Sequence, residues 1–181
     1  AWAMMRAHGI EGYERMTREL MAATRRLIAG VAEIDGIEVL SEPETVMVTL
    51  ASERLNVFEL GDRMEARGWS LVPQFACGGS PRNLHISMTP ANVPQVDALL
   101  ADLSACCTAL LEAGSAIDEA ALQAAVAAVA DKSAPEIMMT LAPQMGLTGD
   151  IPKELATLNT VLNLIDADKR DQLLTMYMNA M

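Results

Sequence analysis

Residues 68–89 read GWSLVPQFACGGSPRNLHISMT, and this stretch decides how the chain folds. Apolar residues recur in a weak period of two over residues 69–75 and in a cleaner one over residues 84–88, which predicts two strands. Between them, Gly78 and Gly79 permit positive φ and Pro81 lacks a backbone N–H, so the first strand cannot continue. Asn92 can cap the helix that follows. The stretch therefore predicts strand, turn, strand and capped helix.

The residues on either side complete a small α+β unit. Helical periodicity is interrupted at His8-Gly9 and then resumes, and a later helix can be capped by Asn56. Two earlier strands are joined by a short connection, so they should pair antiparallel. The order α-β-β-α-β-β-α predicts a small antiparallel or mixed four-stranded sheet with helices packed on it. The predicted helices cover residues 10–31, 56–66 and 93–113, and the two earlier strands cover residues 37–40 and 46–51.

The composition changes after Gly114, where prolines separate short apolar segments of helical periodicity. We expect two domains, residues 1–113 as the α+β unit and residues 114–181 as a helical extension. The extension's apolar faces can pack on the first unit, on a missing domain or on a second subunit. Its predicted helices cover residues 118–130, 134–141, 152–165 and 168–178, with Thr148 or Asp150 and Asp166 as candidate caps.

Composition narrows the class of protein. The formal charge of −11 disfavours binding to nucleic acid or to an anionic membrane. The sequence contains no apolar run long enough to span a bilayer. Three cysteines do not form a disulfide framework, so we expect reduced thiols and a cytoplasmic location. The sequence begins at Ala1 within a helical pattern that has no N-cap before it. This predicts that the N-terminus is a cut end of a longer protein, although removal of an initiator Met before Ala is the alternative.

Catalytic constellations are scarce, and no phosphate loop, metal motif or nucleophile motif is present. Arg82, in the glycine-rich turn, can hold a carboxylate or a phosphate with a two-pronged hydrogen bond, or it can be a solvated loop residue. His85 alternates with core residues of its strand, so it should face away from the core, either toward solvent or toward a site.

The combined pattern resembles the C-terminal small domain of the pyridoxal-phosphate-dependent group II decarboxylases, most of all the branch of bacterial sphingosine-1-phosphate lyases. The resemblance covers about residues 1–113 and rests on several stretches together. They are GIEGY at the start of the long helix, IDGIEVLSEP at residues 34–43, RGWSL at residues 67–71, and Gln74 with the Leu84-His85-Ile86 strand and Thr89.

This resemblance implies a fold-type I enzyme that is usually a dimer, acts on a small-molecule amine and carries pyridoxal phosphate in an upstream domain. The Schiff-base lysine of the family lies in that upstream domain. This chain has nine arginines but no lysine before Lys132, so we expect no catalytic or cofactor-binding residue in it and no activity from it alone. The resemblance points to Arg82, His85 and Gln74 as substrate-binding residues.

Three functions stay open. The first is retro-aldol cleavage of a phosphorylated amino alcohol, in which the cofactor acts as the electron sink. The second is amino-acid decarboxylation, the carboxy-lyase branch, in which an Arg near the last strand holds the substrate carboxylate. Arg82 is displaced by about one residue from that place, which Asn83 occupies. The third is a free-standing, non-catalytic interaction module.

Overall fold

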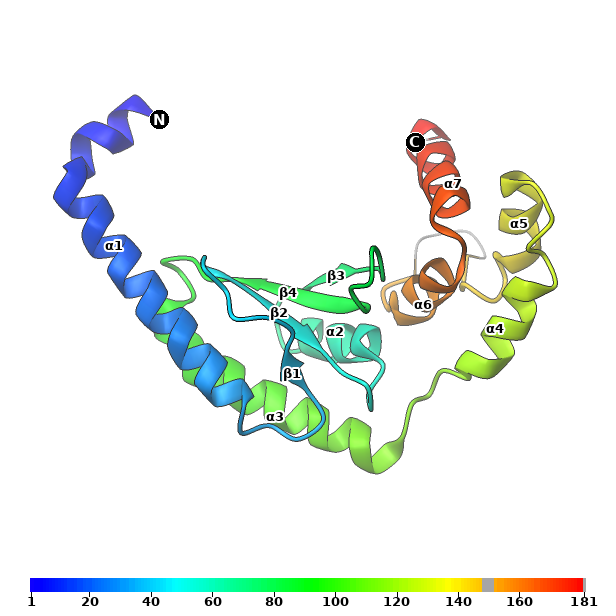
Figure 1. Ribbon diagram of the computed structural model, residues 1–181, viewed down its shortest axis with the longest axis horizontal. Helices are drawn as coiled ribbons and strands as arrows, with labels where there is room; N and C mark the ends of the chain where they lie inside the picture. The colour runs from blue at the N-terminus through cyan, green and yellow to red at the C-terminus, as the bar shows by residue number, and fades with distance from the viewer. Residues whose placement is uncertain (148–151, 181) are drawn as a thin grey trace.

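The computed structural model describes residues 1–147 and 152–180 (Figure 1). Its four strands and most of its helices follow the predicted order. None of the helices in these two ranges is both long and apolar enough to cross a membrane. The elements are α1 (Trp2–Val31), β1 (Glu38–Val39), β2 (Met47–Ala51), α2 (Val57–Glu65), β3 (Val72–Gln74), β4 (Asn83–Ser87), the 3₁₀ turn η1 (Val93–Gln95), α3 (Val96–Ala113), α4 (Glu119–Ala127), α5 (Ala134–Leu141), α6 (Ala156–Leu164) and α7 (Ala167–Ala180).

The sheet has the order β1-β2-β4-β3, and every neighbouring pair is antiparallel. His85 of β4 lies in the centre, opposite Thr49 on one side and Val72 on the other. The fold class is therefore α+β, as predicted, and the predicted antiparallel pairing of the first two strands is confirmed.

One face of the sheet is covered by helices and the other is open (Figure 1). Val48, Leu50, Leu84 and Ile86 point to the covered face and are buried. There they join the inner sides of α1, α2 and α3 in one apolar core. Because side chains alternate along a strand, the residues between them point to the open face.

The long first helix has the predicted break. Gly9 has φ 60° and ψ −175°, outside helical geometry, and its positive φ favours glycine. The part of α1 after the break packs on α3, where Gly30 allows Leu100 to approach closely. The part before it projects away from the core (Figure 1).

The predicted caps have different outcomes. Asn56 caps α2 as expected, accepting hydrogen bonds from the Phe58 and Glu59 amides. The Asp166 side chain accepts a hydrogen bond from the Asp168 amide at the start of α7. The prediction for Asn92 is wrong: its side chain bonds backward to residues 87 and 89, and a 3₁₀ turn precedes α3. Thr148 and Asp150 lie outside the described residues.

The helical extension packs against α2 of its own chain through α6, and it has a second apolar cluster of its own. The predicted helix over residues 152–165 begins later, at Ala156. The division into residues 1–113 and 114–181 stays a prediction. The buried members of the second cluster are Val129, Ala134, Ile137, Leu141, Met145, Val161, Leu162, Ile165 and Leu173.

Candidate functional site

The open face of the sheet is the candidate site, and it brings together two of the three predicted substrate-binding residues. Gln74 lies opposite Asn83, and His85 lies two residues further along β4 on the same face. None of the side chains that the described strands direct to this face is a lysine or an arginine. They are Glu38, Met47, Thr49, Ala51, Val72, Gln74, Asn83, His85 and Ser87.

Asn83 has an unusual environment. The residue is only 4% exposed, and its Nδ2 donates to the Pro81 carbonyl at 2.8 Å. Its Oδ1 is buried and has no hydrogen-bond partner among the described residues. A buried acceptor without a donor costs about 1–3 kcal/mol, and because this oxygen is already covered by its own chain, a donor from another molecule could reach it only if the surrounding side chains moved.

Arg82, the third predicted residue, lies on the other side. Its guanidinium donates twice to Glu119, with Nη1 2.9 Å from Oε2 and Nη2 2.8 Å from Oε1. Its Cζ is 5.9 Å from the centre of the Phe58 ring in α2. A shift of one residue along a strand moves a side chain to the opposite face, so Arg82 is held with the helices while Asn83 shares the face of His85.

Arg82 belongs to a polar network that joins the extension to the sheet unit. Glu119 Oε1 also accepts from Asn56 Nδ2 at 2.8 Å, and the same nitrogen lies 3.0 Å from Thr160 Oγ1 in α6. The sequence predicted Asn56 only as a cap, because its other partners lie 63 and 104 residues away.

The polar face of α2 extends this contact. Glu59 accepts from the Ala116 amide at 2.9 Å and from the Ser115 hydroxyl. Asp62 accepts from two amides at the start of α6, those of the N-cap residue Leu155 at 3.1 Å and of Ala156 at 2.8 Å. Burial raises the pKa of Asp62 above its ordinary value, although these two amides partly oppose the shift.

Sequence reasoning missed these contacts. The signal that could have shown them is the spacing of Asn56, Glu59 and Asp62, which places three polar side chains on one face of a short helix.

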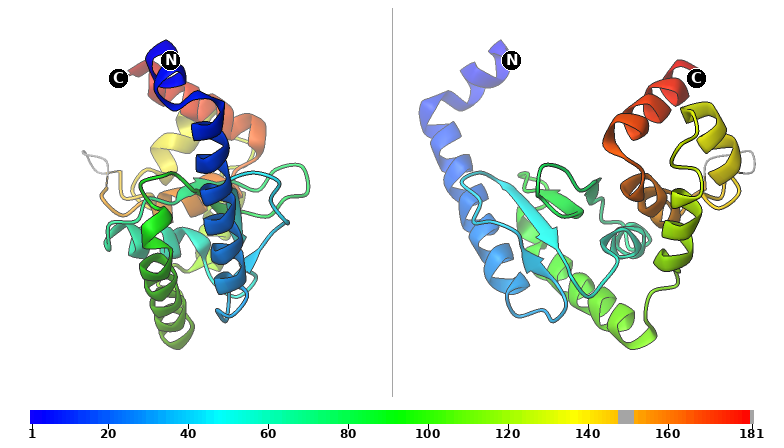
Figure 2. Two further views of the ribbon diagram at one scale, coloured as in Figure 1. Left: turned by 90° about the vertical axis from the view of Figure 1, so that its left-hand side faces the viewer. Right: turned by 45° about the vertical axis from the view of Figure 1, so that its right-hand side comes forward.

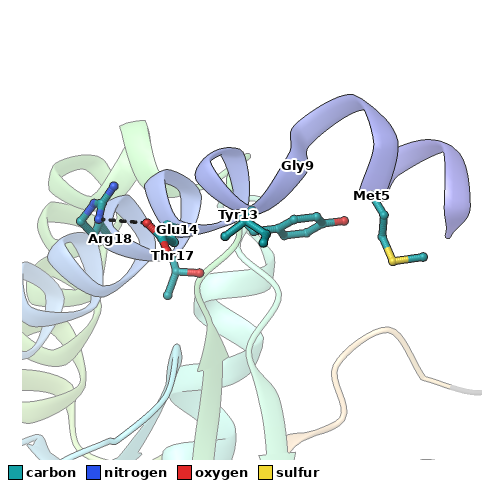
Figure 3. A pocket seen from close by; sticks show the side chains of 7 residues that line it. Met5, Gly9, Tyr13, Glu14, Thr17 and Arg18 are labelled. Carbon is teal, nitrogen blue, oxygen red and sulfur yellow. Dashed lines mark ion pairs between the residues drawn. The ribbon is translucent and has the colours of Figure 1, made fainter.

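A separate hollow of about 680 Å³ lies at the break in α1 (Figure 3). Met5 and Tyr13 project from the same side of the broken helix, and the His8 ring meets the Tyr13 ring edge-on at 5.8 Å. Gly12 is required here because a Cβ would lie 2.9 Å from the Cβ of His8. The hollow is open and mainly apolar, which is typical of a contact surface rather than of a catalytic centre.

Neither the open face of the sheet nor the hollow at the break in α1 carries a lysine that could form a Schiff base with pyridoxal phosphate. The only lysines are Lys132, Lys153 and Lys169, all in the extension and none on the sheet. Lys169 Nζ donates to the Ala130 carbonyl, so its ammonium is engaged within the extension. Within residues 1–147 and 152–180, no group of three or more His, Cys, Asp or Glu side chains could hold a metal ion.

Comparisons with known proteins agree on one group of enzymes. Residues 94–180 match the family model described as "Pyridoxal-dependent enzyme, C-terminal putative HTH domain". Over 103 residues the chain is 39% identical to a sphingosine-1-phosphate lyase of Arabidopsis thaliana, and this match covers 57% of the chain and 18% of that enzyme.

Other relatives include both branches of the group. A sphingosine-1-phosphate lyase of Drosophila melanogaster is 31% identical over 114 residues, 61% of this chain and 20% of that enzyme. A probable L-tyrosine/L-aspartate decarboxylase of Methanothermobacter thermautotrophicus is 31% identical over 103 residues, 56% of this chain and 27% of that enzyme. The chain therefore spans between about a fifth and a quarter of the length of these relatives.

A solved structure supports the fold. A sphingosine-1-phosphate lyase of Burkholderia pseudomallei matches 62% of this chain and 25% of its own chain, with a TM-score of 0.55 and 24% identity. This likeness shows the shared architecture of sheet and helices. The resemblance predicted from the sequence is confirmed: the chain is similar to the C-terminal region of pyridoxal-dependent enzymes, among them sphingosine-1-phosphate lyases and a probable decarboxylase.

Proposed function

We propose that this chain is the C-terminal portion of a pyridoxal-phosphate-dependent carbon–carbon lyase that cleaves a phosphorylated amino alcohol by a retro-aldol reaction. Its similarity to plant and insect sphingosine-1-phosphate lyases supports the assignment. In this proposal the catalytic lysine and the cofactor site lie in a part of the protein outside these 181 residues. The chain alone is then inactive.

One observation favours the lyase over the decarboxylase. Arg82, which directly precedes the last strand, lies on the covered side and is paired with Glu119. The open face carries neutral Asn83 at the neighbouring position. A face without a guanidinium is poorly suited to a substrate carboxylate, which is bound best by a two-pronged arginine contact. It suits an amino alcohol whose phosphate is bound elsewhere.

We assign Gln74 and His85 to the substrate side of this face, since the sheet directs both there. Arg82 stays a predicted substrate-binding residue only if its guanidinium leaves Glu119 when substrate binds. In the full protein, the open face would help to exclude water from the reacting groups. The cofactor, when bound there, supplies the electron sink for bond cleavage.

The second candidate is an amino-acid decarboxylase, supported by the 31% identity to the archaeal enzyme. The third is a free-standing module that makes a protein–protein contact.

We propose a homodimer in the cytoplasm for either enzyme, following the predictions from the sequence. We also propose the division into an α+β domain, residues 1–113, and a helical extension, residues 114–181.

The test uses the longer polypeptide that contains this chain, with the 181-residue chain as control. We expect the longer protein to show the absorbance of bound pyridoxal phosphate and to release an aldehyde from a phosphorylated long-chain base. Release of carbon dioxide from aspartate or tyrosine instead would move the assignment to the decarboxylase branch. If the longer protein shows no cofactor absorbance, the interaction module is the remaining candidate function.

Two variants of the longer protein separate the roles of Arg82. Arg82→Ala removes both the ion pair and the guanidinium, whereas Glu119→Gln removes the ion pair and keeps the guanidinium. If Arg82 binds substrate, only Arg82→Ala raises KM, while both variants lower the melting temperature. Equal KM values in the two variants would refute a substrate-binding role for Arg82.

A further inference from the structure

Strand β3, which carries Gln74, has little support within the sheet. It is an edge strand of three residues and pairs with β4 alone. Its middle residue, Pro73, has no N–H to donate. After Gln74 the chain turns beside α6 (Figure 1), and Figure 2 shows the same neighbourhood from another side. The position of Gln74 therefore depends on what fixes the residues that follow it.

Phe75, the residue after Gln74, joins the two apolar cores. It is partly buried and packs against the core of the sheet unit as well as against the second cluster. Its ring meets the Phe58 ring of α2 edge-on, with the ring centres 6.0 Å apart. The guanidinium of Arg170 in α7 also lies over it, with Cζ 4.8 Å from the ring centre. The Phe75 side chain thus connects the sheet unit to the extension.

Arg170 makes this contact from a buried position. The residue is only 7% exposed, and it forms no ion pair with any residue of 1–147 and 152–180. Burial of a guanidinium is unfavourable unless another group compensates its charge, and the face of an aromatic ring does so by cation–π attraction. The attraction therefore holds the Phe75 ring and the Arg170 guanidinium together.

The backbone of the next residue is held from α6. Asn163 Oδ1 accepts a hydrogen bond from the Ala76 amide at 2.7 Å. The two residues after Gln74 are thus each bound by a different helix of the extension, one through its side chain and the other through its backbone. Because side chains alternate along the chain here, Phe75 points toward the helices while Gln74 points to the open face.

We infer that Arg170 and Asn163 are positioning residues, which fix the end of β3 and thereby the direction of the Gln74 side-chain amide on the open face. The inference rests on the proposed function, in which Gln74 lies on the substrate side. An amide that is already held in place binds a substrate hydroxyl more tightly, because it loses less conformational freedom on binding. The extension then contributes to substrate affinity through β3.

Nuclear magnetic resonance of the 181-residue chain tests the positioning without any catalysis. The side-chain amide signals of Gln74 are assigned by their loss in Gln74→Met. We expect Arg170→Met and Asn163→Leu to shift these signals, because each removes one contact at the end of β3. Arg170→Lys keeps a cation and Asn163→Asp keeps an acceptor, so both should shift them less.

The control for these shifts is Val129→Ala. Val129 is a buried residue of the second cluster that follows α4 and belongs to neither α6 nor α7. Its truncation should lower the melting temperature and leave the Gln74 signals in place. The control therefore separates a loss of packing in the extension from a loss of the contacts at β3.

The longer polypeptide gives the kinetic readout. With a phosphorylated long-chain base as substrate, we expect Arg170→Met to raise KM by about fivefold and to change kcat by less than about twofold, as Gln74→Met does. The double variant should have the KM of Gln74→Met alone, because Arg170 acts through Gln74. A merely structural role of Arg170 would instead multiply the two effects on KM.

Two results would overturn the inference. One is a set of Gln74 signals that stay in place in both Arg170→Met and Asn163→Leu, and the other is effects on KM that multiply in the double variant. If the signals shift but the longer protein shows no cofactor absorbance and releases no aldehyde, the proposed function fails, while the positioning of Gln74 by Arg170 and Asn163 stands.

Discussion

The ion pair between Arg82 and Glu119 should be a principal clamp between the sheet unit and the helical extension, and Glu119→Gln tests it. The side chains are 20% and 36% exposed, so the pair is neither buried nor fully solvated. Exposed pairs contribute up to about 1 kcal/mol, whereas breaking a buried pair costs about 3–5 kcal/mol. The two-pronged geometry and the third donor from Asn56 place this pair between those limits.

We expect Glu119→Gln to lower the free energy of unfolding by about 2 kcal/mol and the melting temperature by about 4–8 °C. Urea unfolding followed by far-ultraviolet circular dichroism measures the first quantity. Tryptophan fluorescence reports on the sheet unit alone, since Trp2 and Trp69 both precede the extension. If the clamp joins the two parts, both signals should shift together.

The matched control is Glu112→Gln, an exposed glutamate on α3 whose loss should change stability by less than about 0.5 kcal/mol. A double-mutant cycle with Arg82→Met should give a coupling energy of about 1–2 kcal/mol. A loss for Glu119→Gln as small as that of the control, together with zero coupling, would refute the clamp.

Three further predictions concern the interior. Gly30→Ala should destabilise the chain by about 1–3 kcal/mol in thermal unfolding, because the new Cβ would lie 2.3 Å from Leu100 Cδ1. Adding Leu100→Ala should recover part of this loss of stability, and no recovery would contradict the contact. Burial raises the pKa of Asp62 above 3.8, so folding favours the protonated form of this carboxyl. Its contribution to the free energy of unfolding is complete below pH 3.8 and disappears as pH rises through the folded-state pKa. The stability of the wild type relative to Asp62→Asn should therefore decline as pH rises from 3.8, and a difference that does not vary with pH would refute the assignment. Burial raises the pKa of the Cys107 thiol to about 12, so Ellman's reagent should find Cys77 reactive in the native chain and Cys107 reactive only in urea.

Several features of the local structure could be predicted from the sequence. The alternation of Leu84 with Ile86 predicted which side of β4 faces the core, and Asn56 marked the start of α2, because both signals depend on a few neighbouring residues. The break at Gly9 was equally local. These features follow from side-chain periodicity and backbone geometry, which are properties of short segments.

The long-range polar contacts could not be predicted in the same way. Arg82 is one residue from β4, and only the position of Glu119 decides which side of the sheet its guanidinium takes. Asn92 had the composition of a helix cap, but its amide bonds backward because the turn after β4 offers partners first. Asn83 as an unpaired acceptor is visible only when its burial is known.

The way α2 holds the extension has a consequence for how this protein can vary. Glu59 and Asp62 bind backbone amides of residues 116, 155 and 156, and any residue except proline can provide such an amide. Many residues of the extension at these junctions could therefore be substituted while the extension stays packed on α2, provided that its own apolar cluster persists. Among related sequences, the docked arrangement could outlast recognisable identity in the extension, with proline at these three positions as the substitution that breaks it.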